Sequence, residues 1–497
     1  MHLKTSSISE RPDLSLSAHI DWYRVPLLRL LREAQSRAIQ AGPRILATFL
    51  LPAADIDPLH VYAALEGTGQ SPRFYWERPA EQAALVGGGA ATLIEANGTT
   101  NFTTVSNAWS EIMQDAVVSG AEETMRFDEN GPICFAGFAF DPLAPRTPLW
   151  SGFPGGLLIL PRLSLRKQAN NAWLALNRMI AAGDDIEQCA DDMLRDLLHL
   201  AVVSEQLAEL PTKANIDGAT SFHTEELCSA SAWKEIVADA VNDIHRGDYK
   251  KVVLGRAVRI TRTEGAFDVN AALQRLRESY PAAHIFALQR GERVFVGATP
   301  EPLVHVSDGQ LLTTALAGTA PRGETEANDT RLGQELLNSA KNREEHAIVV
   351  ETIRDALVGL CAGLEVAPEP HLLRLKNVQH LETPIRGQLL PELSILDTVA
   401  CLHPTPAVGG FPVQTTLEKI RRDEQMDRGW WAGPVGWINA NGNGEFAVAL
   451  RSALVQGNQA TLFAGCGIVA DSEPESEYAE SCAKLQVMLR GLDGSEG

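Results

Sequence analysis

Three strand-like segments follow one another closely between residues 282 and 323. The segments are AAHIFALQ, RVFVGATPEPLVHV and QLLTTALAGTAPRG, joined by the links 290–292 and 307–309. A parallel connection needs a dozen or more residues, so links this short predict antiparallel pairing. Amphipathic helices flank these strands; one is SASAWKEIVADAVNDIHRG, which has a serine at its start and a glycine at its end. The sequence therefore predicts an α+β fold with largely antiparallel sheets.

The chain of 497 residues is long enough for two or three ordinary domains, or for one large domain with a smaller partner. Residues 1–18 are polar and are predicted to be disordered. Residues 19–215 alternate strand-like and helix-like segments and form an N-terminal half, whereas residues 229–490 carry the sharper motifs. The polar stretch 205–228 has no sustained periodicity and is predicted to connect the two halves.

Composition excludes several classes of partner. The net charge of −20 disfavours nucleic acid and anionic membranes, which are bound through an excess of Lys and Arg. A small anionic substrate needs only a local cluster of cations or a metal. The seven cysteines have no CxxC spacing, and their odd number argues against a disulfide framework. With no secretory segment and no apolar run of about 20 residues, the sequence predicts a soluble, cytoplasmic protein, by default a monomer.

The helix predicted for EPESEYAESCAKLQVMLRGL places two carboxylates and an amine on one face. Glu477, Glu480 and Lys484 are spaced i, i+3, i+7. A solvated helix face with an i,i+4 ion pair, worth about 0.3 kcal/mol, explains this pattern as well. A second predicted helix, KNREEHAIVVETIRDALVGLC, offers Glu345. Two helices that each present a glutamate would suit Mg²⁺, with water and a substrate carboxylate completing its coordination.

Two charged residues lie at or within predicted strands. Glu301 follows a strand in GATPEPL and is a candidate catalytic carboxyl, although a solvated turn carboxylate explains it better in isolation. Arg451 lies in FAVALRSALV, which we predict to be one strand. A buried guanidinium there needs an anionic partner, which is either a ligand carboxylate or an internal acidic residue.

The stretch GDYKKVVLGRAVRI begins with two lysines. Alternation places Lys251 on one face with Gly255, which leaves room for its side chain. The same alternation places Lys250 on the other face with Arg256. Both faces carry valine or leucine, which predicts a strand covered on both sides, and of the two lysines we predict Lys250 to be the solvent-facing one. A lysine removed from water has a lowered pKa and can act as a base near neutral pH.

Nine motifs in one order resemble the chorismate-utilising enzymes: KVVLGR, GATPEPL, LAGTAPRG, KNREEH, LHPTPAVGG, GPVGW, FAVALRSA, AGCGIV and ESEYAESCAKL. FYWERP, GGGA, GFAFDP and LPRL in the N-terminal half are similar to isochorismate synthases. The resemblance covers nearly the whole chain. It implies one large α+β domain, with two stacked antiparallel sheets inside a shell of helices and a cleft that binds chorismate and Mg²⁺.

The resemblance also implies roles for individual residues. Glu345 and Glu480 match the metal ligands, and Glu477 matches a carboxylate beside them. Lys251 and Glu301 match the catalytic pair. Residues implied to contact the substrate are Gly318, Thr319, His403, Arg451, Gly465, Gly467 and Lys484.

A few positions distinguish the subfamilies. Enzymes that add water to chorismate have a lysine where Lys251 stands, whereas anthranilate synthases typically have glutamine. Ala317 argues against aminodeoxychorismate synthases, which often have a lysine there. Trp431 replaces a tyrosine that is frequent in salicylate synthases, and Asn342 replaces a common acidic residue, which puts metal affinity in question.

The resemblance implies an isochorismate synthase. This Mg²⁺-dependent isomerase adds water at C2 of chorismate while the C4 hydroxyl leaves, and its product serves menaquinone or siderophore biosynthesis. The alternatives are a salicylate synthase, which also eliminates pyruvate, and an anthranilate synthase large subunit. A chorismate-binding regulatory protein is the alternative that is not an enzyme.

Overall fold

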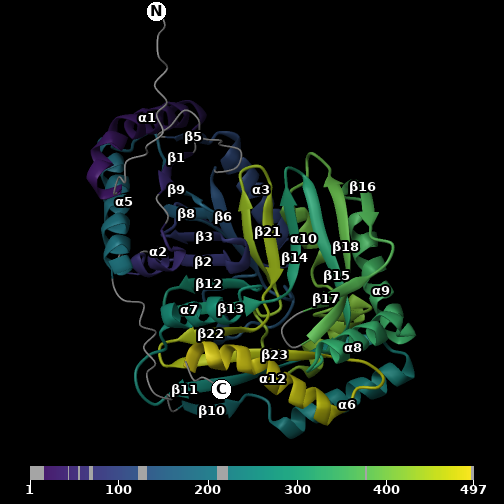
Figure 1. Ribbon diagram of the computed structural model, residues 1–497. Helices are drawn as coiled ribbons and strands as arrows, with labels where there is room; N and C mark the ends of the chain where they lie inside the picture. The colour runs from purple at the N-terminus through teal and green to yellow at the C-terminus, as the bar shows by residue number, and fades with distance from the viewer. Residues whose placement is uncertain are drawn as a thin grey trace, which may run out of the picture.

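The computed structural model describes residues 16–42, 44–53, 56–66, 71–120, 131–209, 222–374 and 378–493. Figure 1 shows two large sheets with helices packed around them. The prediction of an α+β fold with two antiparallel sheets is confirmed. The helices are η1 (Leu16–Tyr23), α1 (Arg24–Ala41), α2 (Pro58–Ala64), η2 (Pro79–Glu81), α3 (Asn101–Gln114), η3 (Pro148–Trp150), α5 (Ile186–Glu209), α6 (Ala230–Arg246), α7 (Val269–Ser279), α8 (Glu326–Asn338), α9 (Ala340–Leu357), α10 (Ile395–Leu402), α11 (Val413–Asp423) and α12 (Pro474–Asp493).

The larger sheet has 13 strands, which come from both halves of the chain. Its order is β10-β11-β23-β22-β13-β12-β2-β3-β8-β9-β1-β5, with β19 paired to β11, and only β1 and β5 are parallel among its described pairs. The strands are β1 (Ile45–Ala53), β2 (Arg73–Arg78), β3 (Ala83–Gly88), β5 (Val117–Gly120), β8 (Leu163–Gln168), β9 (Asn171–Ile180), β10 (Phe222–Glu226), β11 (Lys251–Arg262), β12 (His284–Arg290), β13 (Arg293–Thr299), β19 (Gly410–Phe411), β22 (Ser452–Gln456) and β23 (Gln459–Ile468).

The smaller sheet has 10 strands in the order β16-β18-β15-β14-β21-β20-β6-β7-β4, with β17 paired to β18. Aromatic side chains join it to the larger sheet; the rings of Phe74 and Phe135 are 5.1 Å apart. The strands are β4 (Thr92–Ala96), β6 (Ile133–Phe138), β7 (Gly156–Leu160), β14 (Pro302–Ser307), β15 (Gln310–Pro321), β16 (Cys361–Val366), β17 (His371–Arg374), β18 (Val378–Leu389), β20 (Pro434–Asn439) and β21 (Gly444–Val448).

Two chain segments pass side by side from one sheet to the other. The chain leaves the larger sheet after β13 and enters the smaller one at β14; it returns between β21 and β22. The amide of Val448 donates to the carbonyl of Glu301 (3.0 Å), and the amide of Ala298 donates to the carbonyl of Arg451 (3.1 Å). We call residues 299–301 and 449–451 the seam. The seam brings Glu301 and Arg451 together although 150 positions separate them in the sequence.

The seam corrects one prediction. The run FAVALRSALV is not a single strand, because β21 ends at Val448 and β22 begins at Ser452. Arg451 has φ of 46°, a left-handed conformation that costs a residue with a side chain about 1 kcal/mol. Arg451 therefore lies at a bend between the sheets and not within a strand.

The structure also changes the predicted boundaries. Residues 205–209, predicted as part of a connection, complete α5, and Leu207 packs onto the apolar layer between the helices and the larger sheet. Residues 222–226 form strand β10. Of the N-terminal segment predicted to be disordered, residues 16–18 belong to η1, and residues 1–15 lie outside the described residues.

Glu445 joins the two sheets through a buried ionic cluster. This carboxylate on β21 contacts Arg78 (3.0 Å), His284 (3.1 Å) and Trp76 (3.2 Å), all on strands of the larger sheet. Burial by itself raises the pKa of Glu445, but the bond to His284 and the charge of Arg78 lower it to about 2. The carboxylate form therefore stabilises the packing of one sheet on the other.

Glu445→Gln is expected to lower the free energy of unfolding by about 3 kcal/mol at pH 7. The folded pKa lies below the unfolded one, so this contribution is complete above the unfolded pKa, which is about 4.3. It is lost as the pH falls towards 2. Urea unfolding of both proteins at pH 7 and pH 3.5 measures the difference, which should shrink at the lower pH. A difference that does not change with pH would contradict the assignment.

Candidate active site

The first part of the site lies at the start of β11, where the Lys251 amine is 3.0 Å from Oε1 of Glu345 on α9. A Cβ at Gly467 would lie 2.9 Å from Cε of Lys251, so the glycine provides the room that this side chain occupies. Lys250 is exposed, as predicted, and its amine lies over the ring of Phe411 at 6.0 Å. Arg256, on the same face of the strand as Lys250, is buried, as expected for a strand that is covered on both sides.

The second part is the face of α12 that the sequence predicted. Glu480 and Lys484 form an ion pair (2.6 Å), and Lys484 also donates to the carbonyl of Gly465 (2.9 Å). Glu477 accepts a hydrogen bond from the hydroxyl of Ser472 (2.8 Å). Burial raises the pKa of Glu477, and the charge of Glu480 adds to this effect. This face of α12 therefore lies over the end of β23.

Strand β23 has a free edge beside this helix face. The pairing of β22 with β23 ends at Leu462, so Phe463–Ile468 has no partner on the β22 side among the described strands. Gly465 and Gly467 lie within this segment. Its backbone groups on that edge are thus not paired with β22; the carbonyl of Gly465 accepts from Lys484.

Glu301 and Arg451 form the third part of the site, at the seam. Burial raises the pKa of the Glu301 carboxyl, while the charges of Arg451, Lys251 and Lys484 oppose that shift. Burial also lowers the pKa of Arg451, with Glu301 and Glu480 acting against it. The charges of Lys251 on β11 and Lys484 on α12 therefore both act on the carboxyl group at the seam.

Gly318 and Thr319 lie at an irregularity in β15, where its pairing with β18 shifts register. Gly318 has φ of 74°, and Oδ1 of Asn342 is 3.2 Å from where its Cβ would be. The hydroxyl of Thr319 is 3.0 Å from Nδ1 of His380. Burial lowers the pKa of His380, and the charges of Arg451 and Lys484 add to that shift. His380 thus links this part of β15 to the site.

Sequence reasoning did not find His380. It occurs within NVQHLETP, in a strand where a lone histidine gives no pattern that separates a site residue from an ordinary one. Only the pairing of β15 with β18 places it opposite Thr319.

His403 has different neighbours from the other candidates. Its Nε2 is 2.9 Å from the carbonyl oxygen of Phe140, and burial lowers its pKa to about 4. The charges that act on it are those of Asp141 and Arg428. The predicted contact between His403 and the substrate ring stays a prediction.

The two positions that depart from the subfamily patterns are both well packed. Trp431 is 2% exposed, stacks on Phe463 and lies against Gly255 and Gly465. Asn342 donates to the Ser339 hydroxyl (2.8 Å) at the start of α9. Trp431 therefore fills space next to the end of β23, and Asn342 stabilises the helix that carries Glu345.

The carboxylates fit a hard divalent cation. Within the described part of the chain, ligand atoms of Glu477, Glu480 and Cys466 lie within 4.8 Å of one another. Glu345 is not in this group, because its carboxylate is turned towards Lys251. Carboxylate oxygens on two different helices, each partly accessible, are the donors that Mg²⁺ uses together with water.

A two-sheet core that brings carboxylates, lysines and an arginine near one another at the seam is typical of an enzyme that acts on a small anionic substrate. The family model described as chorismate binding enzyme matches residues 32–493. The chain belongs to this family, and its substrate class is chorismate. No helix among the described residues is long and apolar enough to cross a bilayer.

Individual relatives match nearly the whole chain. The isochorismate synthase MenF of Bacillus subtilis is 36% identical over 476 residues, 95% of this chain and 98% of the relative. The salicylate biosynthesis isochorismate synthase of Pseudomonas aeruginosa is 38% identical, with 93% of each chain covered. The solved structure of MenF, the menaquinone-specific isochorismate synthase from Escherichia coli, has a TM-score of 0.70 at 27% identity. The match covers 93% of this chain and 99% of the chain in that structure.

Proposed function

We propose that the protein is an isochorismate synthase that converts chorismate to isochorismate reversibly. The proposal is supported by the charges of Lys251, Arg451 and Lys484, which all act on the Glu301 carboxyl. The similarity of the whole chain to relatives named isochorismate synthases supports the same activity.

The positive charges around the seam suit a dicarboxylate substrate. Arg451 can hold one carboxylate with its planar guanidinium, and Lys484 adds a second charge from α12. Backbone groups at the free edge of β23, around Gly465 and Gly467, complete this grip. Gly318 and Thr319 are assigned to the pocket of the ring; Thr319 is bonded to His380, on which the charges of Arg451 and Lys484 act.

Glu345 and Glu480 are the proposed Mg²⁺ ligands, with Glu477 beside them. The bound cation supplies positive charge that anchors the ring carboxylate and draws electron density from the ring. Each of the two ligands has a lysine as its partner, Lys251 for Glu345 and Lys484 for Glu480. A cation held by Glu345 would compete with Lys251 for this carboxylate, which pairs with the amine in the structure.

Proton transfer is assigned to Lys251 and Glu301. Neutral Lys251 takes a proton from the water that forms the new C2–O bond. Protonated Glu301 gives its proton to the C4 hydroxyl, which leaves as water while the double bond moves. One water enters and one leaves, and a proton returned from Lys251 to Glu301 restores the enzyme. The raised pKa of Glu301 supports its role as the acid.

The expected product is isochorismate alone, formed with Mg²⁺ and without ammonium. Chromatography of the reaction with chorismate, with and without EDTA, tests this directly. Pyruvate and salicylate in stoichiometric amounts would instead identify a salicylate synthase, and anthranilate formed only with ammonium would identify an anthranilate synthase. Binding of chorismate without turnover would identify a regulatory protein. The relatives' names allow a product for menaquinone or for siderophore and salicylate biosynthesis.

A further inference from the structure

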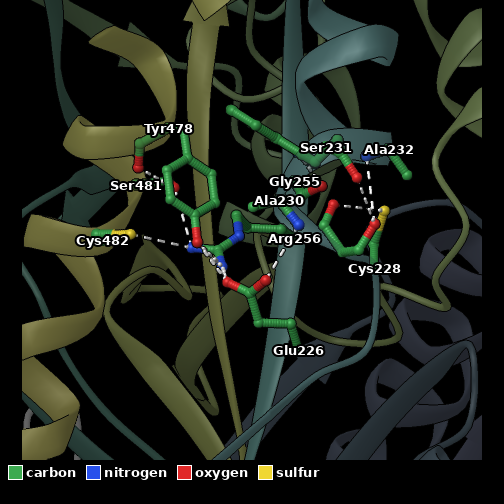
Figure 2. A network of polar contacts seen from close by, with 12 residues as sticks. Glu226, Cys228, Ala230, Ser231, Ala232, Gly255, Arg256, Tyr478, Ser481 and Cys482 are labelled. Carbon is green, nitrogen blue, oxygen red and sulfur yellow. Dashed lines mark hydrogen bonds and ion pairs between the residues drawn. The ribbon is translucent and has the colours of Figure 1, made fainter. Parts of the chain in front are cut away.

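A buried arginine lies beneath the helix that carries the proposed metal ligands. Arg256 is on β11, and its side chain is 1% exposed. It forms an ion pair with Glu226 on β10, and its guanidinium contacts Ser481 (3.2 Å) and Cys482 (3.5 Å) on α12. Its Cζ lies 4.5 Å from the ring centre of Tyr478. Figure 2 shows Arg256 between Tyr478 and Glu226.

Glu226 extends the network to two helices. The hydroxyl of Tyr478 donates to Oε1 of Glu226, the oxygen that also accepts from Arg256. The other oxygen, Oε2, accepts from the amide of Ala230 at the start of α6 (3.0 Å). Two strands and two helices therefore meet at one ion pair, in which the arginine is buried and the glutamate is partly exposed.

The residues that Arg256 contacts alternate with the site residues along α12. Tyr478, Ser481 and Cys482 form one stripe of the helix. Glu477, Glu480 and Lys484 form the neighbouring stripe, because successive residues are about 100° apart around the axis. Holding the first stripe therefore fixes the direction in which the second one points.

Small rotations of α12 matter at the site. Side-chain ends lie about 5–6 Å from a helix axis, so a rotation of about 20° moves them by about 2 Å. That movement equals the whole Mg²⁺–oxygen bond, about 2.0–2.1 Å, and Mg²⁺ requires near-ideal octahedral geometry. The other contacts of α12 include apolar packing through Leu485, Met488 and Leu492. They also include two hydrogen bonds to backbone carbonyls, from Lys484 to Gly465 (2.9 Å) and from Arg275 to Gly491 (2.8 Å). Apolar packing is non-directional, whereas the guanidinium fork is directional.

We propose that Arg256 is a positioning residue that fixes the rotation of α12 and so sets the geometry of Glu477, Glu480 and Lys484. The inference depends on the proposed function, since it concerns the metal and substrate groups on α12. A buried ion pair adds little net stability, and its best-documented use is to specify one arrangement among several. Lys251, on the same strand as Arg256, thereby stays in register with the α12 carboxylates.

Direct binding of Mn²⁺, followed by electron paramagnetic resonance of the free ion, tests the inference. Arg256→Met is expected to raise the Kd for Mn²⁺ by about 10-fold, the lower end of the range for residues that orient metal ligands. Arg256→Lys keeps the charge but cannot reach Glu226 and Ser481 together, so we expect a smaller increase. Tyr478→Phe removes only the hydroxyl that donates to Glu226 and leaves the aromatic ring, so the core stays filled.

The matched control is Arg259→Met. Arg259 lies on the same strand and pairs with Glu225 of β10 (2.9 Å), but the pair is partly exposed. The Kd of Arg259→Met for Mn²⁺ should match that of the parent protein. In the Arg256 variants the KM for chorismate should rise with the Kd, while kcat at saturating Mn²⁺ and chorismate should recover, because Lys251 and Glu301 lie outside α12.

The outcomes separate the two proposals. A parent protein that binds no Mn²⁺ contradicts the metal site and this inference with it. A parent that binds Mn²⁺, with unchanged Kd and KM in Arg256→Lys and Tyr478→Phe but a lower Tm, overturns this inference alone. Should Arg256→Met fail to fold, these two variants decide the question.

Discussion

Lys251→Ala is expected to lower kcat by about 10³-fold, within the range for a positioned proton acceptor. The amine lies beside Gly467 and faces the space that Glu301 shares with Arg451 and Lys484. Without it, no other amine at the start of β11 points into this space, since the neighbouring Lys250 is exposed. Steady-state kinetics with chorismate, together with substrate binding by calorimetry, measure the loss and show whether binding remains.

Two further variants separate proton transfer from the ion pair with Glu345. Lys250→Ala is the matched control and should retain parental kcat, because that amine lies over Phe411 outside the site. Lys251→Arg keeps a positive charge next to Glu345 but cannot act as a base, because arginine stays protonated. We expect it to bind chorismate and to be as inactive as the alanine variant. An active arginine variant would show that position 251 supplies charge alone, and a new proton acceptor would then be needed.

The general fold could be predicted because its information is local. Links of about three residues between strands fix antiparallel pairing wherever they occur. Caps do the same for helices: the Ser229 side chain accepts from the amide of Ala232 at the start of α6, and Gly247 ends that helix in a left-handed conformation. Neither feature depends on distant parts of the chain.

The seam could not be predicted, because its cause is not local. The run FAVALRSALV alternates like one strand, and nothing in it marks a break. The break arises because β21 pairs with strands of one sheet and β22 with strands of the other. For the same reason alternation placed Arg256 on one face of its strand but did not show that α12 covers that face.

Sequence reasoning predicted the arrangement of site residues that share one helix or strand. It did not predict how site residues from different elements contact one another. The stripe of Glu477, Glu480 and Lys484 is a property of one helix, and the structure retains it. The neighbours of His403 and the presence of His380 depend on pairings between distant segments. Spacing within a motif therefore predicted which residues face the same way, and only the tertiary structure showed what they face.

Glu301→Gln is expected to lower kcat by about 10²- to 10⁴-fold, because the C4 oxygen would leave without a proton. Burial raises the pKa of Glu301, and Arg451, Lys251 and Lys484 limit the increase. The acid form is the active one, so kcat/KM should fall as the pH rises through this pKa. That decline in kcat/KM should occur at a pH above the ordinary pKa range of carboxyl groups. The pH profile of the residual activity of Glu301→Gln should not show this decline.

Glu292→Gln is the control for this variant. Glu292 lies in the turn before β13, at the opposite end of that strand from Glu301, and its carboxylate contacts only the amide of Gln456 (3.5 Å) among its recorded partners. Its pH profile should match that of the parent. If Glu301→Gln kept both the parental rate and the parental decline with pH, the proton donor would be another group. If it lost the rate but kept the decline, Glu301 would position the substrate and the titrating group would lie elsewhere. Only loss of both identifies the buried carboxyl at the seam as the acid.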